Sequence, residues 1–291
     1  MSLIVEVFFN IIKFINKILI FFKKKNFINY LFDKLYSESI TKIVINNNIV
    51  KMWTPSNFAA WAAQNFLGKR KAIEEFISNI PDKKDIVFWD IGANLGFYSL
   101  YCASKKQNVK IVAFECSSSA VLSISKNVSI NNFHDKISIF PIGLTNVDSD
   151  FLILKEHSDS LGAQFNALNT EFELENWKYK NRYKIFSNNL SNLVDNKSLK
   201  SLPDYIKIDC DGLELEILEG FKKYLSDLRI KSIIIQMKFG PRIVDNKKFD
   251  DDKIILRSNK IYSLLEKCGF KSRHLEKGME KKGQYLDIFE R

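Results

Sequence analysis

The chain has 291 residues, of which 46% are hydrophobic and 27% are charged, and its formal net charge is +10. These proportions are ordinary for a soluble globular protein with one large domain or two small ones. The cysteines form no C-x-x-C pair and the histidines show no metal-ligand spacing, so we expect neither a disulfide framework nor a metal site. The positive charge favours an acidic partner, such as a membrane surface, although a solvated basic surface is the alternative.

Residues 1–25 form an apolar segment that ends in a basic run, Lys23 to Lys25. The polar residues within it fall on one narrow helical stripe: Glu6, Asn10, Lys13, Asn16 and Lys17. A spanning helix needs about 20 apolar residues with few charges, so these charges argue against spanning. We expect this helix to lie on an anionic membrane surface, with packing on its own domain or on a partner subunit as the alternative.

Residues 26–84 are expected to form an adaptor region ahead of the main domain. The apolar pattern from Ile43 to Met52 predicts a β-hairpin that turns at Asn46 to Asn48. Ser56 is a candidate N-cap for a helix that runs to Phe66. A further helical pattern covers residues 71–80.

Residues 85–291 are expected to form the main domain. Strands and helices alternate from Asp85 onward, which predicts an α/β, Rossmann-like core with a mostly parallel, doubly wound sheet. The expected strands are 86–90, 109–115, 136–141, 205–209 and 230–236, and the expected helices are 96–105, 117–131, 213–225 and 255–268.

Two stretches depart from this alternation. Residues 143–200 are interpreted as a substrate-side insertion with a strand at 151–154, a polar loop at 157–162, and an aromatic-charged run from Trp177 to Phe186. Its part from Trp177 to Tyr183 is interpreted as a lid or a mixed surface helix, with a basic stripe for nucleic acid as the weaker alternative. Residues 238–253 are expected to be a polar loop. Strands at 270–274 and 285–289 are expected to close the sheet as an antiparallel hairpin.

The first chemical motif follows the strand that ends at Asp90. Its turn carries Gly92, Asn94 and Gly96, residue types that tolerate left-handed backbone angles and leave room for a ligand. The N-terminus of the next helix offers free N–H groups, which suits a nucleoside cofactor. The dinucleotide fingerprint would need glycine where this chain has Asn94 and Phe97, which argues against a nicotinamide cofactor.

Acids also end two other expected strands. Glu115 ends the strand after the glycine turn, where a carboxylate can accept hydrogen bonds from both hydroxyls of a ribose. Asp209 ends a later strand and faces the same crevice as Asp90 if the two strands are neighbours. We expect Asp209 to be the general base, with Asp211 and Glu214 as weaker catalytic candidates. The alternative makes these acids turn, capping and helix-start residues.

Together these segments resemble the FkbM family of methyltransferases. The similarity rests on three segments: Asp90 to Ser99, Val112 to Glu115 and Ile206 to Glu214. The resemblance implies a class I methyltransferase fold, S-adenosylmethionine as cofactor, and O-methylation of a saccharide, glycan-precursor or natural-product hydroxyl. It implies cofactor contacts at Asp90, Gly92, Ala93, Asn94, Gly96, Glu115 and Cys116.

The chain departs from the family pattern on the acceptor side. Asp211 stands where the family usually has Glu, Gln236 stands where a strand-end Glu is common, and residues 189–192 lack an expected acid. A catalytically inactive, membrane-associated scaffold therefore stays open as an alternative, as does a nicotinamide-dependent oxidoreductase.

The acceptor is expected to be a small molecule or a glycan rather than a nucleic acid. The five prolines supply neither a Pro-Pro-aromatic strand end nor a Pro-Cys nucleophile, which nucleic-acid methylation usually shows. We expect a cytoplasmic protein that associates with the inner face of the membrane.

Overall fold

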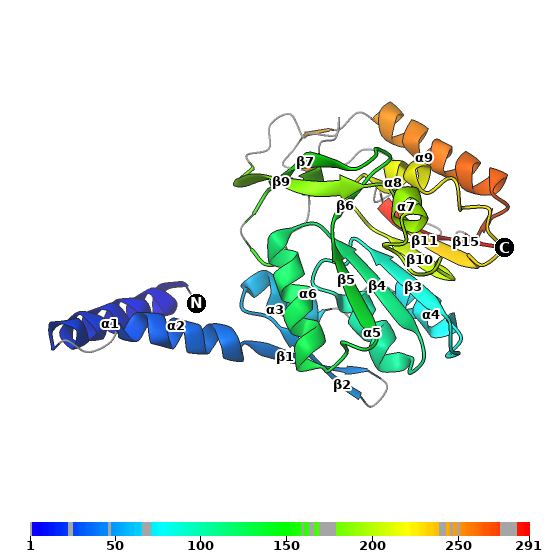
Figure 1. The fold of residues 1–291 in the computed structure, drawn as a ribbon. Helices are drawn as coiled ribbons and strands as arrows, with labels where there is room; N and C mark the ends of the chain where they lie inside the picture. Colours follow the sequence, from blue (N-terminus) through cyan, green and yellow to red (C-terminus); the bar gives the residue numbers. More distant parts are fainter. Residues whose placement is uncertain are drawn as a thin grey trace.

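The computed structural model describes residues 2–22, 26–45, 48–65, 71–158, 160–162, 166–168, 179–238, 243–244, 247–248, 251–273 and 284–291. Within them a seven-stranded sheet with the order β14-β15-β11-β10-β3-β4-β5 forms the centre of the protein (Figure 1). Strands β11, β10, β3, β4 and β5 run parallel, whereas β15 is antiparallel to both β11 and β14. The strands are β3 (Val87–Ile91), β4 (Lys110–Glu115), β5 (Ile137–Pro141), β10 (Tyr205–Ile208), β11 (Ser232–Lys238), β14 (Lys271–Ser272) and β15 (Gln284–Glu290).

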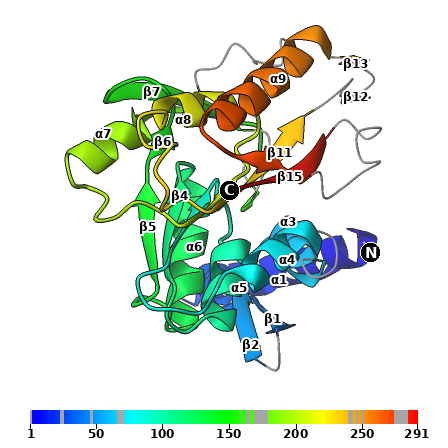
Figure 2. The ribbon, with the colours of Figure 1, turned by 90° about the vertical axis from the view of Figure 1, so that its right-hand side faces the viewer.

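Helices cover both faces of this sheet, which confirms the predicted α/β, Rossmann-like architecture. Alternate residues of β3 enter different cores, because successive side chains of a strand point to opposite faces. Phe88 packs with α3 (Asn57–Gln64), α4 (Lys71–Asn79), α5 (Phe97–Lys105) and α6 (Ser118–Ile130). Trp89 packs in the core that contains α7 (Leu190–Asp195), α8 (Glu214–Gly220) and α9 (Asp251–Lys267). Figure 2 shows α8 and α9 beside β11 and β15.

The predicted hairpin of the adaptor region is present as β1 (Ile40–Ile45) and β2 (Asn48–Trp53); its turn residues 46–47 lie outside the described residues. Ser56 caps α3 by accepting a hydrogen bond from the Ala59 N–H, as predicted; Phe66 lies outside the described residues. Apolar residues of β1, β2, α3 and α4 belong to the same core as α5 and α6. The described residues between 40 and 80 therefore pack as part of the main body.

The chain begins its described part with two helices that extend away from the sheet (Figure 1). Helix α1 (Ser2–Phe21) matches the predicted apolar helix, whereas α2 (Phe27–Glu38) was not predicted. The lysines at 23–25 lie outside the described residues. None of the helices in the described ranges has the length and apolar character needed to cross a bilayer.

The described residues of the segment 143–200 include a second, four-stranded sheet with the order β6-β9-β7-β8. The prediction of a strand at 151–154 is confirmed within β7, but a surface helix over residues 181–183 is wrong, because they start a strand that pairs antiparallel with β7. Residues 177–178 lie outside the described residues. The strands are β6 (Gly143–Leu144), β7 (Asp150–Glu156), β8 (Ala167–Leu168) and β9 (Asn181–Asn188).

Two further segments differ from the prediction. Helix α8 ends at Gly220 and turns replace its predicted continuation to 225. Gly220 approaches the Thr145 carbonyl so closely that a Cβ would lie 2.2 Å from that oxygen, and glycine is a poor helix former. The predicted polar loop 238–253 contains two short paired strands, β12 (Ile243–Val244) and β13 (Lys247–Lys248), between residues outside the described ranges. The predicted antiparallel closing strands are confirmed as β14 and β15, although residue 274 lies outside the described ranges.

Substituting Gly96 by Ala should lower the free energy of unfolding by about 2–5 kcal/mol. Gly96 has φ +83°, and a Cβ there would lie 2.6 Å from Cγ1 of buried Ile124. Gly269 is the matched control, since its φ is +91° but nothing lies within 4 Å of a Cβ. Gly269→Ala should therefore cost only about 1–2 kcal/mol. Urea denaturation of both variants measures the difference, and equal costs would show that the Ile124 contact is not limiting.

Candidate active site

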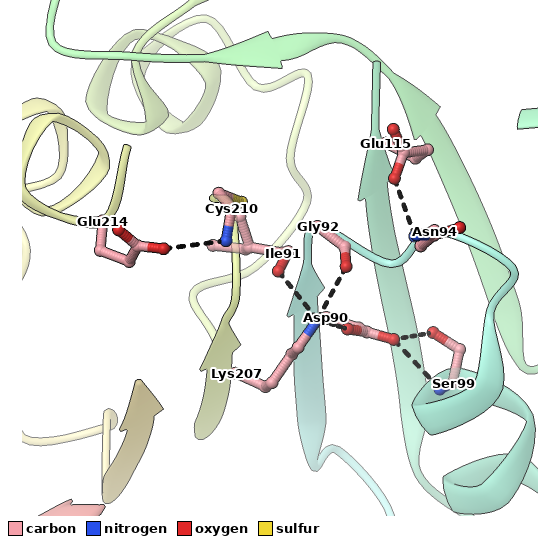
Figure 3. A network of polar contacts seen from close by, with 9 residues as sticks. All are labelled: Asp90, Ile91, Gly92, Asn94, Ser99, Glu115, Lys207, Cys210 and Glu214. Carbon is pink, nitrogen blue, oxygen red and sulfur yellow. Dashed lines mark hydrogen bonds and ion pairs between the residues drawn. The ribbon is translucent and has the colours of Figure 1, made fainter. Parts of the chain in front are cut away.

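The carboxyl end of β3 is held by a buried ion pair (Figure 3). Lys207 Nζ, from the neighbouring strand β10, lies 3.1 Å from Asp90 Oδ1, and both side chains are almost fully buried. Lys207 also donates hydrogen bonds to the carbonyls of Ile91, at 3.2 Å, and Gly92, at 2.8 Å. Asp90 Oδ2 accepts from the N–H and the hydroxyl of Ser99 in the first turn of α5. One ion pair thus fixes β3, β10, the turn and α5 together.

The environment keeps Lys207 charged. Burial acts to lower its pKa, but the carboxylates of Asp90 and Asp209 outweigh this effect, and the pKa lies above the usual value for lysine. The stabilisation that comes from the charge on Lys207 is therefore complete below the ordinary lysine pKa, and it is lost as the pH rises past the raised value.

The glycines of the turn are required by packing inside the protein. Gly92 has φ +73°, and a Cβ there would lie 2.1 Å from the Asp209 carbonyl oxygen. The space beside Gly96 is filled by Ile124. The N–H groups of Gly92 and Ala93 donate to the Phe114 carbonyl. Neighbouring elements therefore occupy the space that a side chain at Gly92 or Gly96 would need, although the backbone of Gly92 also lines the cavity described next.

A cavity with about 640 Å³ of empty space, part of it open to solvent, lies at the carboxyl ends of β3, β4 and β10. This edge of a parallel sheet is where ligands of α/β proteins bind. Six predicted site residues line the cavity: Gly92, Asn94, Glu115, Cys116, Asp209 and Asp211. Apolar side chains from the second sheet form another part of its wall: Leu144, Leu154 and Leu168. The insertion therefore contributes directly to the cavity.

Four of the predicted residues do not line this cavity. Asp90 is 0% exposed and engaged by Lys207 and Ser99, whereas Ala93 and Gly96 support the turn. Glu214 is buried, and its Oε1 accepts hydrogen bonds from the N–H groups of Cys210 and Gly212. In the structure Asp90 and Glu214 are thus held by partners within the protein, and their contact with cofactor or substrate stays a prediction.

Glu115 lines the cavity with a carboxylate that three backbone N–H groups hold in place. Its Oε2 accepts a hydrogen bond from the Asn94 N–H at 2.7 Å, and its Oε1 accepts from the N–H groups of Cys116 and Ser117, each at 2.8 Å. A carboxylate has about four acceptor positions, so the described contacts leave about one for a ligand. Burial raises the pKa of Glu115, although the three backbone donors and Lys207 act to lower it.

Two amide oxygens complete the acceptor character of the cavity. Among the described residues, Oδ1 of Asn94 and Oδ1 of Asn166 are buried without a hydrogen-bond partner. The Asn94 amide nitrogen donates to the Gly162 carbonyl at 3.2 Å, which fixes the orientation of the amide. A buried acceptor without a partner is costly, so these oxygens fit a ligand that brings N–H or O–H donors.

Sequence reasoning missed Asn166 and Lys207. Nothing in the sequence around Asn166 marks it, because its place depends on the second sheet. Lys207 did carry a signal, since a lysine inside an apolar strand that reads Tyr-Ile-Lys-Ile is rarely buried without a charged partner.

Replacing Lys207 by Met should lower the free energy of unfolding by about 3–5 kcal/mol, because Asp90 would be left buried without a counter-charge. The double variant with Asp90→Asn should recover part of this loss. Lys223→Met is the control, since the Lys223–Asp195 pair is exposed and its loss should leave stability nearly unchanged. Chemical denaturation of the variants checks this; equal effects of Lys207→Met and Lys223→Met would contradict the role of the buried pair.

The comparisons with known proteins agree with this geometry. Residues 90–272, more than half of the chain, match the methyltransferase FkbM domain. Methyltransferase sdnD from Sordaria araneosa is 24% identical over 180 residues, which are 55% of this chain and 68% of that protein.

Solved structures are also similar. Methyltransferase FkbM from Methylobacillus flagellatus has a TM-score of 0.44 at 15% identity; the match covers 73% of this chain and 45% of that one. A chain from Streptococcus mutans in complex with SAH has a TM-score of 0.44 at 12% identity over 76% of this chain and 96% of its own. By its domain match, this chain belongs to the FkbM family of methyltransferases, as the sequence resemblance predicted.

Proposed function

We propose that the cavity binds S-adenosylmethionine and that the protein methylates a hydroxyl of a saccharide or glycan precursor. The observation that carries the proposal is the acceptor-rich lining: the Glu115 carboxylate and the buried, unpartnered oxygens of Asn94 and Asn166 among the described residues. S-adenosylmethionine matches this lining with ribose hydroxyls, amino groups and a positive sulfonium. The pyrophosphate of a dinucleotide would instead bring further acceptors, which disfavours the nicotinamide alternative.

Particular residues would hold this cofactor. Glu115 would accept a hydrogen bond from a ribose hydroxyl, and Asn94 and Asn166 would accept from N–H groups. Apolar side chains that line the same cavity, such as Phe114 and Ile142, would pack against the adenine ring of the cofactor. Bound there, the cofactor supplies an electrophilic methyl group on a good leaving group.

The chain's own part of the reaction is to hold the acceptor hydroxyl, take its proton and keep water away. Asp209 lines the cavity at the end of β10, and its backbone N–H donates to the Ile91 carbonyl of β3 at 3.2 Å. A carboxylate placed there can orient a hydroxyl and accept its proton as the oxygen is methylated. The leucines of the second sheet would exclude water from the reacting groups.

The two acids that follow β10 support a saccharide acceptor. Asp209 and Asp211 both line the cavity, and two carboxylates can accept hydrogen bonds from neighbouring hydroxyls of a sugar. In this proposal, residues 1–25 hold the enzyme at the cytoplasmic face of an anionic membrane, where a lipid-linked precursor would be reached.

Glu115→Ala should weaken S-adenosylmethionine binding by about 1–3 kcal/mol, because hydrogen bonds to a charged acceptor are lost. Isothermal titration calorimetry measures the affinity. Glu266→Ala, an exposed glutamate on α9, is the control and should bind like the unsubstituted protein. Equal affinities for all three proteins would remove Glu115 from the cofactor site.

The same affinity should depend on pH. The ionised Glu115 carboxylate is the better acceptor and its pKa is raised, so binding should weaken as the pH falls toward that value, at a higher pH than an ordinary glutamate would require. Glu115→Gln should bind more weakly but without this dependence. The same pH dependence in Glu115→Gln would assign the titration to another group.

Asp209→Asn should lower kcat by about 10²–10⁴-fold while S-adenosylmethionine still binds. The assay follows transfer of a radiolabelled methyl group to a glycan fraction, with the cofactor affinity measured in parallel. Unchanged turnover would exclude Asp209 as the base. Tight cofactor binding without turnover by the unsubstituted protein on any fraction would favour the inactive scaffold.

A further inference from the structure

Helices α1 and α2 lie side by side as a two-helix arm (Figure 1). Asn16, which is only 8% exposed, joins them: its Oδ1 accepts a hydrogen bond from the Ile28 N–H at 3.0 Å, in the first turn of α2. The first N–H groups of a helix lack partners within the helix, so Asn16 satisfies one of them. The buried polar residue of the α1 stripe thus serves the contact with α2.

The arm exposes a large apolar surface on both helices. The exposed fraction of large apolar side chains on α1 reaches 65% at Phe14 and 80% at Phe21. On α2, Tyr30 is 68% and Phe32 is 67% exposed. Contiguous exposed apolar surface of this kind marks a site of interaction. Because these side chains are exposed, the described residues outside α1 leave its apolar surface uncovered.

We propose that the α1–α2 arm embeds its apolar surface in the interface of an anionic lipid bilayer. The importance of this membrane contact for catalysis rests on the proposed function. The contact would place the enzyme at the surface where it meets a lipid-linked acceptor. It extends the sequence expectation for residues 1–25, because α2 contributes exposed aromatic side chains of its own.

The width of the apolar face favours lipid over a second copy of the chain. A two-stranded coiled coil uses a narrow apolar seam flanked by charged residues. On α1 the residues spaced as a seam would be Ile4, Val7, Ile11, Phe14 and Ile18. One flank of this seam carries further exposed apolar residues, Phe8 and Ile15, and only the other flank is polar, with Asn10 and Lys17. A helix lying in a membrane interface submerges such a broad face.

The charges of the arm fit anionic headgroups. Lys13 and Lys17 are exposed on the polar stripe of α1, which also carries Glu6. On α2, Lys34 pairs with Glu38 at 3.9 Å, so the lysines of α1 are the ones that face outward without that pairing. Three more lysines lie between the helices in the sequence, at 23–25. Lysines beside a membrane-embedded apolar face attract acidic lipids.

A specific joint connects the arm to the catalytic body. The rings of Tyr36 on α2 and Trp53 on β2 pack edge-on, with their centres 4.7 Å apart. The Trp53 indole N–H also donates a hydrogen bond to the Tyr36 carbonyl at 2.6 Å. Lys126 Nζ of α6 lies 4.2 Å from the centre of a Trp53 ring. The Trp53 backbone N–H donates to Asn127, whose amide donates to the Leu95 carbonyl in the turn after β3. Binding of the arm would therefore hold the body at the same surface.

The test is co-sedimentation of the full chain with vesicles of phosphatidylcholine alone or with phosphatidylglycerol added. The unsubstituted protein should sediment with the anionic vesicles, and the double variant Phe14→Asp, Ile18→Asp should lose at least tenfold in bound fraction. Phe32→Asp should also reduce binding. Leu228→Asp is the matched control, since Leu228 is 75% exposed outside the arm and should have no effect. Lys13→Glu with Lys17→Glu should remove the preference for anionic vesicles.

Two outcomes would overturn the proposal. One is an unsubstituted protein that stays in solution with both kinds of vesicle. The other is a dimer, seen by light scattering, that Phe14→Asp, Ile18→Asp dissociates without any effect on lipid binding. Circular dichroism of the same variants separates these outcomes from misfolding. Calorimetric titration of S-adenosylmethionine separates them from failure of the proposed function, because the arm does not line the cavity.

Discussion

The ion pair between Asp90 and Lys207 is the interaction on which the site depends. It joins the ends of β3 and β10, which pair in parallel, and it holds the two carbonyls that lead into the glycine turn. Neither charge is tolerable in the core without the other, so strand order and turn geometry are fixed together. The close approach of the Asp209 carbonyl to Gly92 then follows, and it brings the acids after β10 and the turn after β3 to one cavity.

The chemistry of that cavity follows from what remains unsatisfied in it. The Lys207 ammonium group contacts Asp90 and donates hydrogen bonds to two backbone carbonyls, so its charge lies on the buried side of the turn. The described polar groups that face the cavity are mainly acceptors, from Glu115, Asn94, Asn166 and the acids after β10. Such a lining fits a ligand rich in donors, which is the property shared by the cofactor and the acceptor that we propose.

Local sequence patterns predict much of the fold around the cavity. The strand-turn-helix at Asp90 to Phe97 and the acid at Glu115 were predictable because apolar periodicity and turn residues are short-range signals. The second sheet was not, because β7 pairs with β9 across a long separation that no local pattern encodes. The same limit applies to the partners of Asp90 and Glu214: Lys207 and the N–H groups after β10 could not be identified from local sequence patterns.

A crystal structure of this chain with S-adenosylhomocysteine is the most direct measurement of the central claim. The account predicts a ribose hydroxyl within hydrogen-bonding distance of the Glu115 carboxylate and N–H donors on the amide oxygens of Asn94 and Asn166. A ligand bound elsewhere, or a cavity that takes a dinucleotide in preference, would contradict it.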